Sequence, residues 1–212
     1  LLNNYLAVGI ALGLALATKW SGGFLIPVFL LFVVIENRAN LKNLLKPIAQ
    51  LILLPVGVYL ISWSGWIFSD KGWGRNSEAN LLSSLWSYHM QILSFHQDLV
   101  EQHSYQANPW SWLILGRPTS FFYEDAANCG QTKCAQEILA MGTPFLWWSA
   151  VFAVAITIGF FISNKDRKAA IILLGFAATY LPWFLIQERT TFYFYAISTL
   201  PFLILAIIYC FN

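Results

Sequence analysis

Charged residues are scarce in this chain: only 10% of its 212 residues are Asp, Glu, Lys or Arg. A soluble domain usually carries about 25% charged residues, so the mean hydropathy of +0.60 excludes both a soluble domain and a disordered chain. The net charge of +2 is small and its charges are scattered, which excludes a nucleic-acid-binding surface. With 58% hydrophobic residues, the composition predicts a polytopic protein embedded in a lipid bilayer.

The motifs of several soluble enzymes are also missing. The sequence has no glycine-rich phosphate loop, no Asp-x-Asp pair for a nucleotide-bound metal and no Gly-x-Ser-x-Gly nucleophile turn. A soluble nucleotide-sugar donor is therefore poorly supported, whereas a lipid-linked phosphate donor stays compatible. The chain begins at Leu1 without a signal peptide, so we expect a piece of a longer protein.

Long hydrophobic runs, in contrast, are abundant, and a helix needs about 20 apolar residues to cross a bilayer. Four runs of suitable length cover residues 47–68, 145–163, 169–187 and 193–211. A fifth run, residues 5–35, would reach about 45 Å as one helix, beyond a hydrocarbon core of about 30 Å. Lys19 and the glycines after it break this run into two predicted helices, 5–18 and 22–35. We therefore expect an all-α fold of about six transmembrane helices.

Lysine and arginine in the short loops predict the orientation. The loops 36–46 and 164–168 each carry three Lys or Arg residues against a single acidic residue. Such an excess marks cytoplasmic loops. The loop 69–144, the turn around Arg189 and the break at Lys19 should then share the extracytoplasmic face.

The outer loop 69–144 separates two predicted membrane parts, residues 1–68 and 145–212. Apolar residues recur with helical spacing at its centre and predict an amphipathic helix, 80–103, that lies along the membrane surface. Its apolar stripe consists of Leu82, Leu85, Trp86, Ile92, Leu93, Leu99 and Val100. An aromatic segment, Asn-Pro-Trp-Ser-Trp at 108–112, follows the helix and suits the level of the lipid headgroups.

His89, His96 and His103 are spaced seven residues apart and would share one face of that helix. Seven residues rise about 10.5 Å along a helix, whereas zinc needs every imidazole nitrogen at about 2 Å. We therefore expect no metal, and no other cofactor, and we favour packed or hydrogen-bonded histidines. The open alternative is that one of them contacts a phosphate or hydroxyl of a substrate.

Two cysteines, Cys129 and Cys134, bracket four residues of the outer loop. Outside the cytoplasm such a pair predicts a small disulfide-closed turn, which would stabilise the loop by about 2 kcal/mol at most. Two free thiols are the alternative. Cys210 lies in a predicted span and is interpreted as a small apolar residue.

Three cations on the predicted outer face form the candidate site: Lys19, Arg117 and Arg189. An ammonium at mid-membrane costs about 2.5–3.5 kcal/mol, and Arg189 directly precedes an aromatic run. Cations at helix ends beside aromatic residues suit a phosphate at the membrane surface. Snorkelling of Lys19 to the interface and pairing of Arg189 with Glu188 are the structural alternatives.

Several segments together resemble the protein O-mannosyltransferase family, in order and over nearly the whole chain. They are GLALATKWSGG (13–23), YHMQILSFHQDLVEQHSYQANPWSWLILGRPTSFFYE (88–124), GTPFLWW (142–148) and ERTTFYFYAISTLPF (188–202). The direct passage from the Gly-Trp-Gly-Arg turn (72–75) into the histidine helix resembles the bacterial branch, because eukaryotic members carry a β-trefoil insertion there. The resemblance implies a GT-C-type integral membrane enzyme, present here as its C-terminal half.

The implied reaction transfers mannose from polyprenyl-phosphate mannose to Ser or Thr of secreted proteins, on the extracytoplasmic face of the cell membrane. In that family the catalytic Asp-Glu pair lies in the first outer loop, upstream of this chain, so we expect no catalytic residue here. Glu124 and Asp125 do not match that motif. The candidate contacts to the donor phosphate or substrate are Arg189, Lys19, Arg117, His103, Tyr105 and Trp112.

Two other functions stay open. Another GT-C transferase of lipid-phosphate sugars, such as an arabinosyl or aminoarabinosyl transferase, would use the same phosphate chemistry. A transporter or channel module also buries cations along its path. The long outer loop 69–144 favours an enzyme over a pore, and an Asp-Glu pair in an upstream outer loop would decide between them.

Overall fold

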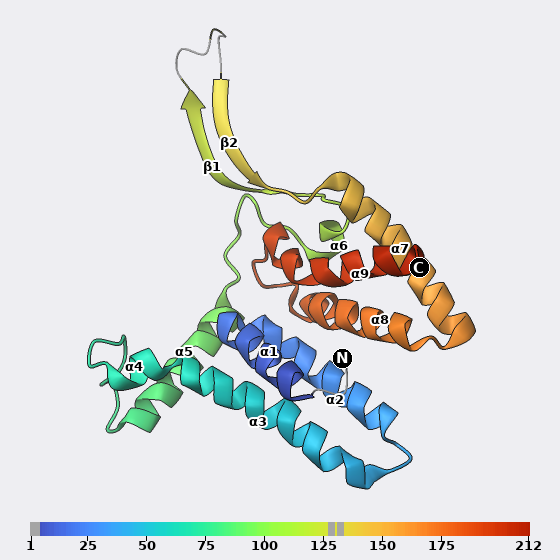
Figure 1. The fold of residues 1–212 in the computed structure, drawn as a ribbon. Helices are drawn as coiled ribbons and strands as arrows, with labels where there is room; N and C mark the ends of the chain where they lie inside the picture. Colours follow the sequence, from blue (N-terminus) through green and yellow to red (C-terminus); the bar gives the residue numbers. More distant parts are fainter. Residues whose placement is uncertain (1–4, 127–129, 131–133) are drawn as a thin grey trace. The chain divides into compact units, whose positions relative to one another are not determined.

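The computed structural model describes residues 5–126, 130 and 134–212 of the chain. It is mostly helical, and the sheet within these residues is one two-stranded antiparallel hairpin (Figure 1). The chain divides into two compact units, residues 1–99 and 100–212. Each unit has its own set of packed helices.

The first unit is built around three apolar helices joined by short 3-10 turns. Leu12, Val33 and Leu51, one from each helix, are buried together as its core. Since each of the three helices contributes one fully or nearly fully buried side chain, the helices share this core. The elements are α1 (Tyr5–Thr18), η1 (Trp20–Phe24), α2 (Leu25–Glu36), η2 (Leu41–Leu44), α3 (Leu45–Ser62), α4 (Ser64–Phe68) and α5 (Leu81–Asp98).

Helix α1 lies directly against α3 at a glycine. A Cβ atom added to Gly13 would come within 2.6 Å of the Val58 Cβ and 2.9 Å of the Pro55 Cα. No side chain fits in that space, so glycine allows the two backbones to approach closely. Small residues at helix contacts are typical of membrane proteins, where packing rather than water exclusion drives helix association.

Helix α5 starts with a reciprocal cap. The Asn80 side chain accepts a hydrogen bond from the Ser83 N–H at 2.9 Å, and the Asn80 N–H donates to the Ser83 hydroxyl at 3.2 Å. The helix ends at Asp98 rather than at His103, because Leu99 leaves the helical conformation at ψ 80°. The apolar side chains after Asp98 continue the helical spacing in the sequence, but their backbone is not helical.

The apolar stripe of α5 divides into two faces. Leu85 and Ile92 are half-buried within the first unit. Leu82, Trp86 and Leu93 are 76%, 67% and 38% exposed, and their spacing of four and seven residues places them on one side of the helix. An exposed apolar row on a helix with polar neighbours is what a membrane-surface helix requires, and that location stays a prediction.

In the second unit α7, α8 and α9 pack against one another pairwise. Ala150, Leu203 and Ala206 are fully buried at these contacts. The small alanines, like the glycine of α1, let the helices come close. The elements are α6 (Pro109–Trp112), β1 (Thr119–Ala126), β2 (Cys134–Ala140), α7 (Pro144–Asn164), α8 (Arg167–Tyr180), η3 (Leu181–Ile186), η4 (Tyr193–Thr199) and α9 (Leu200–Cys210).

Within the described residues, four helical segments are long and apolar enough to cross a membrane: Lys42–Ser62, Pro144–Asn164, Arg167–Ile186 and Tyr193–Cys210. The apolar helices Tyr5–Thr18 and Trp20–Glu36 are shorter. The polytopic membrane character of the fold is therefore confirmed by length and composition, whereas the number of about six spans stays a prediction.

Three of these segments contain both 3-10 and α-helical turns, and in Arg167–Ile186 and Tyr193–Cys210 a proline lies at the change. Pro182 lies at the start of η3, and Pro201 lies in the first turn of α9. Proline has no N–H and its ring collides with the preceding turn, so it interrupts the α-helical ladder. The hydropathy pattern alone shows each segment as one uninterrupted helix.

The β1–β2 hairpin corrects the all-α expectation. Its strands align antiparallel from the pair Thr119–Ala140 to the pair Ala126–Cys134. The pairing skips Phe121, which forms a bulge. Aromatic residues favour strands, but the run is short and both of its faces are exposed, so it lacks the alternation of apolar and polar residues by which a strand is usually identified.

Candidate functional site

The candidate site lies in the second unit, where residues 101–118, the outer segment, meet residues 188–192, the Arg189 turn. The Ala107 N–H donates to the Thr191 carbonyl at 2.9 Å. In return the Thr191 hydroxyl donates to the Ala107 carbonyl, also at 2.9 Å. Two reciprocal bonds at one residue pair fix the distance between the two segments.

Thr190 and Trp112 complete this attachment. The Thr190 hydroxyl donates to the Glu101 carbonyl, and the Trp112 indole N–H donates to the Ala107 carbonyl at 2.9 Å. Trp112 has no exposed surface, so it is a core residue that fixes the outer segment. A direct contact between Trp112 and a substrate stays a prediction beside this packing role.

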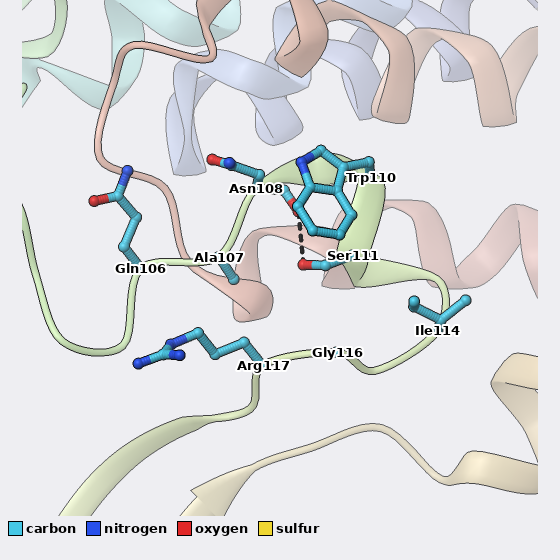
Figure 2. A pocket seen from close by; sticks show the side chains of 8 residues that line it. All are labelled: Gln106, Ala107, Asn108, Trp110, Ser111, Ile114, Gly116 and Arg117. Carbon is cyan, nitrogen blue, oxygen red and sulfur yellow. Dashed lines mark hydrogen bonds between the residues drawn. The ribbon is translucent and has the colours of Figure 1, made fainter.

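A hollow of about 440 Å³ opens beside this attachment, and Figure 2 shows the residues around it. They are Gln106, Ala107, Asn108, Trp110, Ser111, Ile114, Gly116 and Arg117. The Ser111 hydroxyl donates to the Asn108 carbonyl at 2.8 Å, which closes the first turn of α6 (Figure 2). Among the described residues, the Asn108 side-chain oxygen is one of few buried polar atoms without a hydrogen-bond partner. The hollow is thus lined by the polar residues Gln106, Asn108 and Arg117 together with the apolar side chains of Trp110 and Ile114.

Sequence reasoning missed Trp110 as a site residue. The indole of Trp110 is 61% exposed, whereas that of Trp112 is fully buried. The two tryptophans are two positions apart in a single helical turn, and residues at that spacing point to different sides of a helix. Only the packing of α6 decides which of them faces outward.

Arg117 lies at the edge of the hollow, on the same side as Gln106 (Figure 2). Its Nε donates to the Ser104 carbonyl at 3.0 Å, and one terminal nitrogen donates to the same oxygen. This carbonyl is neutral, so the contact fixes the guanidinium without cancelling its charge. The residue is exposed, and its positive charge is directed at the surface of the unit.

Arg189 is held differently. Its guanidinium carbon lies 5.7 Å from the centre of the Tyr195 ring, a cation–π distance. The backbone N–H of Arg189 donates to the Ile186 carbonyl at 3.1 Å, which closes the turn. The Tyr195 ring in turn lies 5.1 Å from Trp183. The half-buried arginine therefore packs over the Tyr195 ring, which is itself in contact with Trp183.

His103 and Tyr105 lie at the start of the outer segment. The Tyr105 N–H donates to the His103 Nδ1 at 3.1 Å, so a neutral His103 ring carries its hydrogen on Nε2. The ring lies 5.1 Å from Phe192 of the Arg189 turn. The structure thus brings His103, Tyr105, Arg117 and Arg189 into one unit. His89 and His96 belong to the other unit, on α5, and the predicted helix face common to all three histidines does not exist because the helix ends at Asp98.

Lys19 belongs to the first unit. It precedes η1 with an extended backbone, φ −156° and ψ 133°, and its side chain is exposed. The three predicted cations are therefore distributed over the two units, two of them in the second.

The acidic and cysteine residues of the hairpin lie apart from these cations in the sequence. The Tyr123 hydroxyl donates to Asp125 at 3.2 Å, and the negative charge of Asp125 raises the pKa of Tyr123. Glu124 and Asp125 are exposed on β1. Cys129 lies outside the described residues, so its predicted disulfide with Cys134 stays a prediction.

The fold and this site define a polytopic membrane protein that presents fixed arginines and a polar hollow beside a helical bundle. Residues 81–212 match the family model described as the C-terminal four TMM region of protein-O-mannosyltransferase. The chain therefore belongs to the protein O-mannosyltransferase family, which confirms the resemblance found in the sequence.

Curated relatives support the same assignment. The chain is 32% identical over 94% of its length to the polyprenol-phosphate-mannose--protein mannosyltransferase of Mycobacterium tuberculosis (strain CDC 1551 / Oshkosh), of which it covers 44%. To the protein of the same name in Corynebacterium glutamicum it is 31% identical, over 93% of the chain and 44% of the relative. Dolichyl-phosphate-mannose--protein mannosyltransferase 1 of Saccharomyces cerevisiae is 27% identical over 55% of the chain and 15% of the relative. No solved structure matches.

Proposed function

We propose that this chain is the C-terminal part of a bacterial-type enzyme that transfers mannose from polyprenyl-phosphate mannose to Ser or Thr of secreted proteins. The observation that carries the proposal is the family match over residues 81–212, because this stretch contains the outer segment and the Arg189 turn. The chain spans less than half the length of its bacterial relatives, so the activity belongs to the longer protein.

The first task of this part is to hold the donor phosphate. Negative charge builds on the phosphate as the bond between sugar and phosphate oxygen breaks, and cations fixed in advance stabilise that charge without reorganisation. Arg189 is fixed by the Tyr195 ring, and Arg117 by the Ser104 carbonyl. Lys19, in the first unit, is proposed as a phosphate contact because it is a cation at a helix end directly before Trp20.

The second task is to receive a group with several hydroxyls. The amides of Gln106 and Asn108 both donate and accept hydrogen bonds, and Trp110 offers a broad apolar face. His103 and Tyr105 lie along the same outer segment. This set suits a mannosyl group, whose ring has polar edges and apolar faces.

The proton of the acceptor hydroxyl needs a carboxylate base. We assign that base to an Asp-Glu pair in the upstream part of the protein, as the family resemblance implies, together with a GT-C-type fold and inversion at the anomeric carbon. Glu124 and Asp125 are exposed on the hairpin, and Asp125 accepts the Tyr123 hydroxyl. We do not assign them a catalytic role.

The site is proposed to face the outside of the cell membrane, because the lysine- and arginine-rich loops 36–46 and 164–168 mark the cytoplasmic side. A cysteine introduced at Ser104 should then react with an impermeant reagent in intact cells. A cysteine at Asn40 should be protected. Protection at Ser104 together with labelling at Asn40 would show that the topology is the reverse of the proposed one.

The activity is tested with the full-length protein in membranes, polyprenyl-phosphate mannose labelled in the sugar, and a peptide with Ser and Thr. We expect labelled mannose on a hydroxyl side chain of the peptide, located by mass spectrometry. The purified 212-residue chain should transfer none. Transfer from an arabinosyl or aminoarabinosyl lipid only, or ion flux through liposomes without transfer, would contradict the proposal.

A further inference from the structure

Three side chains of the first unit form a continuous hydrogen-bonded chain. The Trp20 indole N–H donates to the Tyr59 hydroxyl oxygen at 3.0 Å, and that oxygen lies 2.8 Å from the His89 Nε2. The His89 Nδ1 lies 2.7 Å from the Leu85 carbonyl oxygen. A carbonyl only accepts, so Nδ1 carries the hydrogen of the neutral ring and Nε2 accepts from the Tyr59 hydroxyl. Each polar side-chain atom of this three-residue network therefore has a hydrogen-bond partner.

Aromatic rings hold the imidazole of His89 from three sides. The Trp63 ring centre lies 4.6 Å away, the Trp20 ring is nearly parallel at 5.9 Å, and Tyr59 approaches edge-on at 5.7 Å. All of these residues are half-buried. They come from η1, from the end of α3 and from α5, so the hydrogen-bonded network joins three elements. Fully satisfied polar networks in such surroundings rigidify the structure.

The backbone next to Trp20 is equally constrained. The Lys19 N–H donates to the Ala15 carbonyl at 3.0 Å, and the Lys19 carbonyl accepts the Gly22 N–H at 2.8 Å. A Cβ atom on Gly22 would come within 2.6 Å of the Ala15 carbonyl group. The break after α1 is thus folded tightly onto the end of that helix. The side chain of Lys19 is exposed, whereas that of Trp20 is half-buried.

We propose that Trp20, Tyr59 and His89 are positioning residues that set the place of Lys19 toward the phosphate of the lipid donor. A lysine ammonium is a point charge on a flexible stem, so its effect on a developing phosphate charge depends on where the backbone anchors it. The side-chain network anchors Trp20, and Trp20 anchors its neighbour. This inference rests on the proposed function, since it takes the lipid-linked phosphate as the ligand of Lys19.

The test uses the full-length protein and the variants Tyr59→Phe, His89→Gln, His89→Ala and Lys19→Ala. Tyr59→Phe removes the central hydroxyl and keeps the ring, so kcat/KM for the lipid donor should fall about 3- to 10-fold. His89→Gln retains a side-chain acceptor and should be more active than His89→Ala. The matched control is Tyr88→Phe. Tyr88 directly precedes His89, and its hydroxyl lies outside the network, so removing it should leave activity unchanged.

Coupling to Lys19 distinguishes positioning from a merely structural clamp. If Tyr59 acts through Lys19, the double variant Lys19→Ala/Tyr59→Phe should be no less active than Lys19→Ala alone. The proposal would be overturned if the fold-losses in activity of the two single variants multiplied in the double variant. Normal activity of Lys19→Ala would also overturn it. Only variants with a normal protein level and gel-filtration profile are compared. If Tyr59→Phe does not fold, His89→Gln takes its place in the double variant.

Binding of polyprenyl phosphate without mannose provides a readout that does not need transfer. Its Kd should rise in Tyr59→Phe and in Lys19→Ala, and no further in the double variant. Coupled binding in a protein that transfers no mannose would support the positioning role and refute the proposed reaction. Mannose transfer without any coupling would support the reaction and refute the positioning role.

Discussion

The carbonyl of Ala107 accepts two hydrogen bonds, and removing them one at a time tests how the outer segment is held. Its donors are the Thr191 hydroxyl and the Trp112 indole, each at 2.9 Å. Thr191→Val deletes the first donor and Trp112→Phe the second. In either single variant the buried carbonyl keeps one partner, so each lost hydrogen bond should cost about 1 kcal/mol of folding free energy. Trp112→Phe adds the cost of a smaller ring.

The double variant is the decisive case. With both donors gone, the buried carbonyl has no partner. Loss of the second donor then costs about 1–3 kcal/mol, whereas loss of one donor alone costs about 1 kcal/mol. The loss should therefore exceed the sum of the single losses. In thermal unfolding of the detergent-solubilised protein, each kcal/mol corresponds to about 2–4 °C in Tm for a chain of this size.

Strict additivity of the shifts in Tm would refute this reasoning, because it would mean that water replaces the missing donors at Ala107. The control is Thr190→Val, which removes a hydroxyl from the neighbouring residue whose partner is the Glu101 carbonyl. Thr190→Val should add to Trp112→Phe without coupling, since the two side chains share no acceptor.

Three further predictions concern other parts of the chain. In the full-length enzyme, activity should fall in the order wild type, Arg189→Lys, Arg189→Ala at constant protein level, with about a 100- to 1,000-fold loss for Ala; near-normal turnover of Arg189→Ala would remove it from the phosphate site. Gly13→Leu should lower the Tm or the yield of folded protein, because its Cβ would lie 2.6 Å from that of Val58; unchanged stability would contradict the close packing of α1 on α3. The Tyr209 hydroxyl donates to Asp166 and lowers the pKa of that carboxyl below 3.8, so stability present above pH 3.8 should be lost as the pH falls through the lowered pKa, and Asp166→Asn should abolish this dependence in a pH series of thermal unfolding.

The hydrophobic runs predicted most of the helical content, since a membrane span is a property of length and composition. Pro144–Asn164 and Arg167–Ile186 are among the helical segments that meet the length requirement. The interruptions within the spans depend on single residues such as Pro201, which hydropathy averaging does not weigh. The hairpin was missed because its strands bury neither face, so no alternation of apolar and polar residues marks them.

The candidate site was predictable only in part. Arg189 stood out because it directly precedes an aromatic run, and Arg117 stood out as a further cation of the predicted outer loop. The structure holds both of them by specific contacts. Exposure of Trp110 and burial of Trp112 follow from the packing of one short turn, which no periodicity indicates. The link between Tyr59 and His89 joins residues 30 positions apart in the sequence, and a single sequence carries no signal for such a pair.

The hairpin also has a consequence for how the length of this protein can change. Its strands bury little, and the ring of Phe121 lies 5.5 Å from that of Phe194 near the base of the hairpin. Because successive side chains of a strand point to opposite faces, an insertion of two residues in each strand would lengthen the hairpin and keep Phe122 facing Ile138. A single-residue insertion in β1 would exchange its two faces. Length variants of this hairpin should therefore be tolerated in steps of two residues per strand, without any change in the membrane helices.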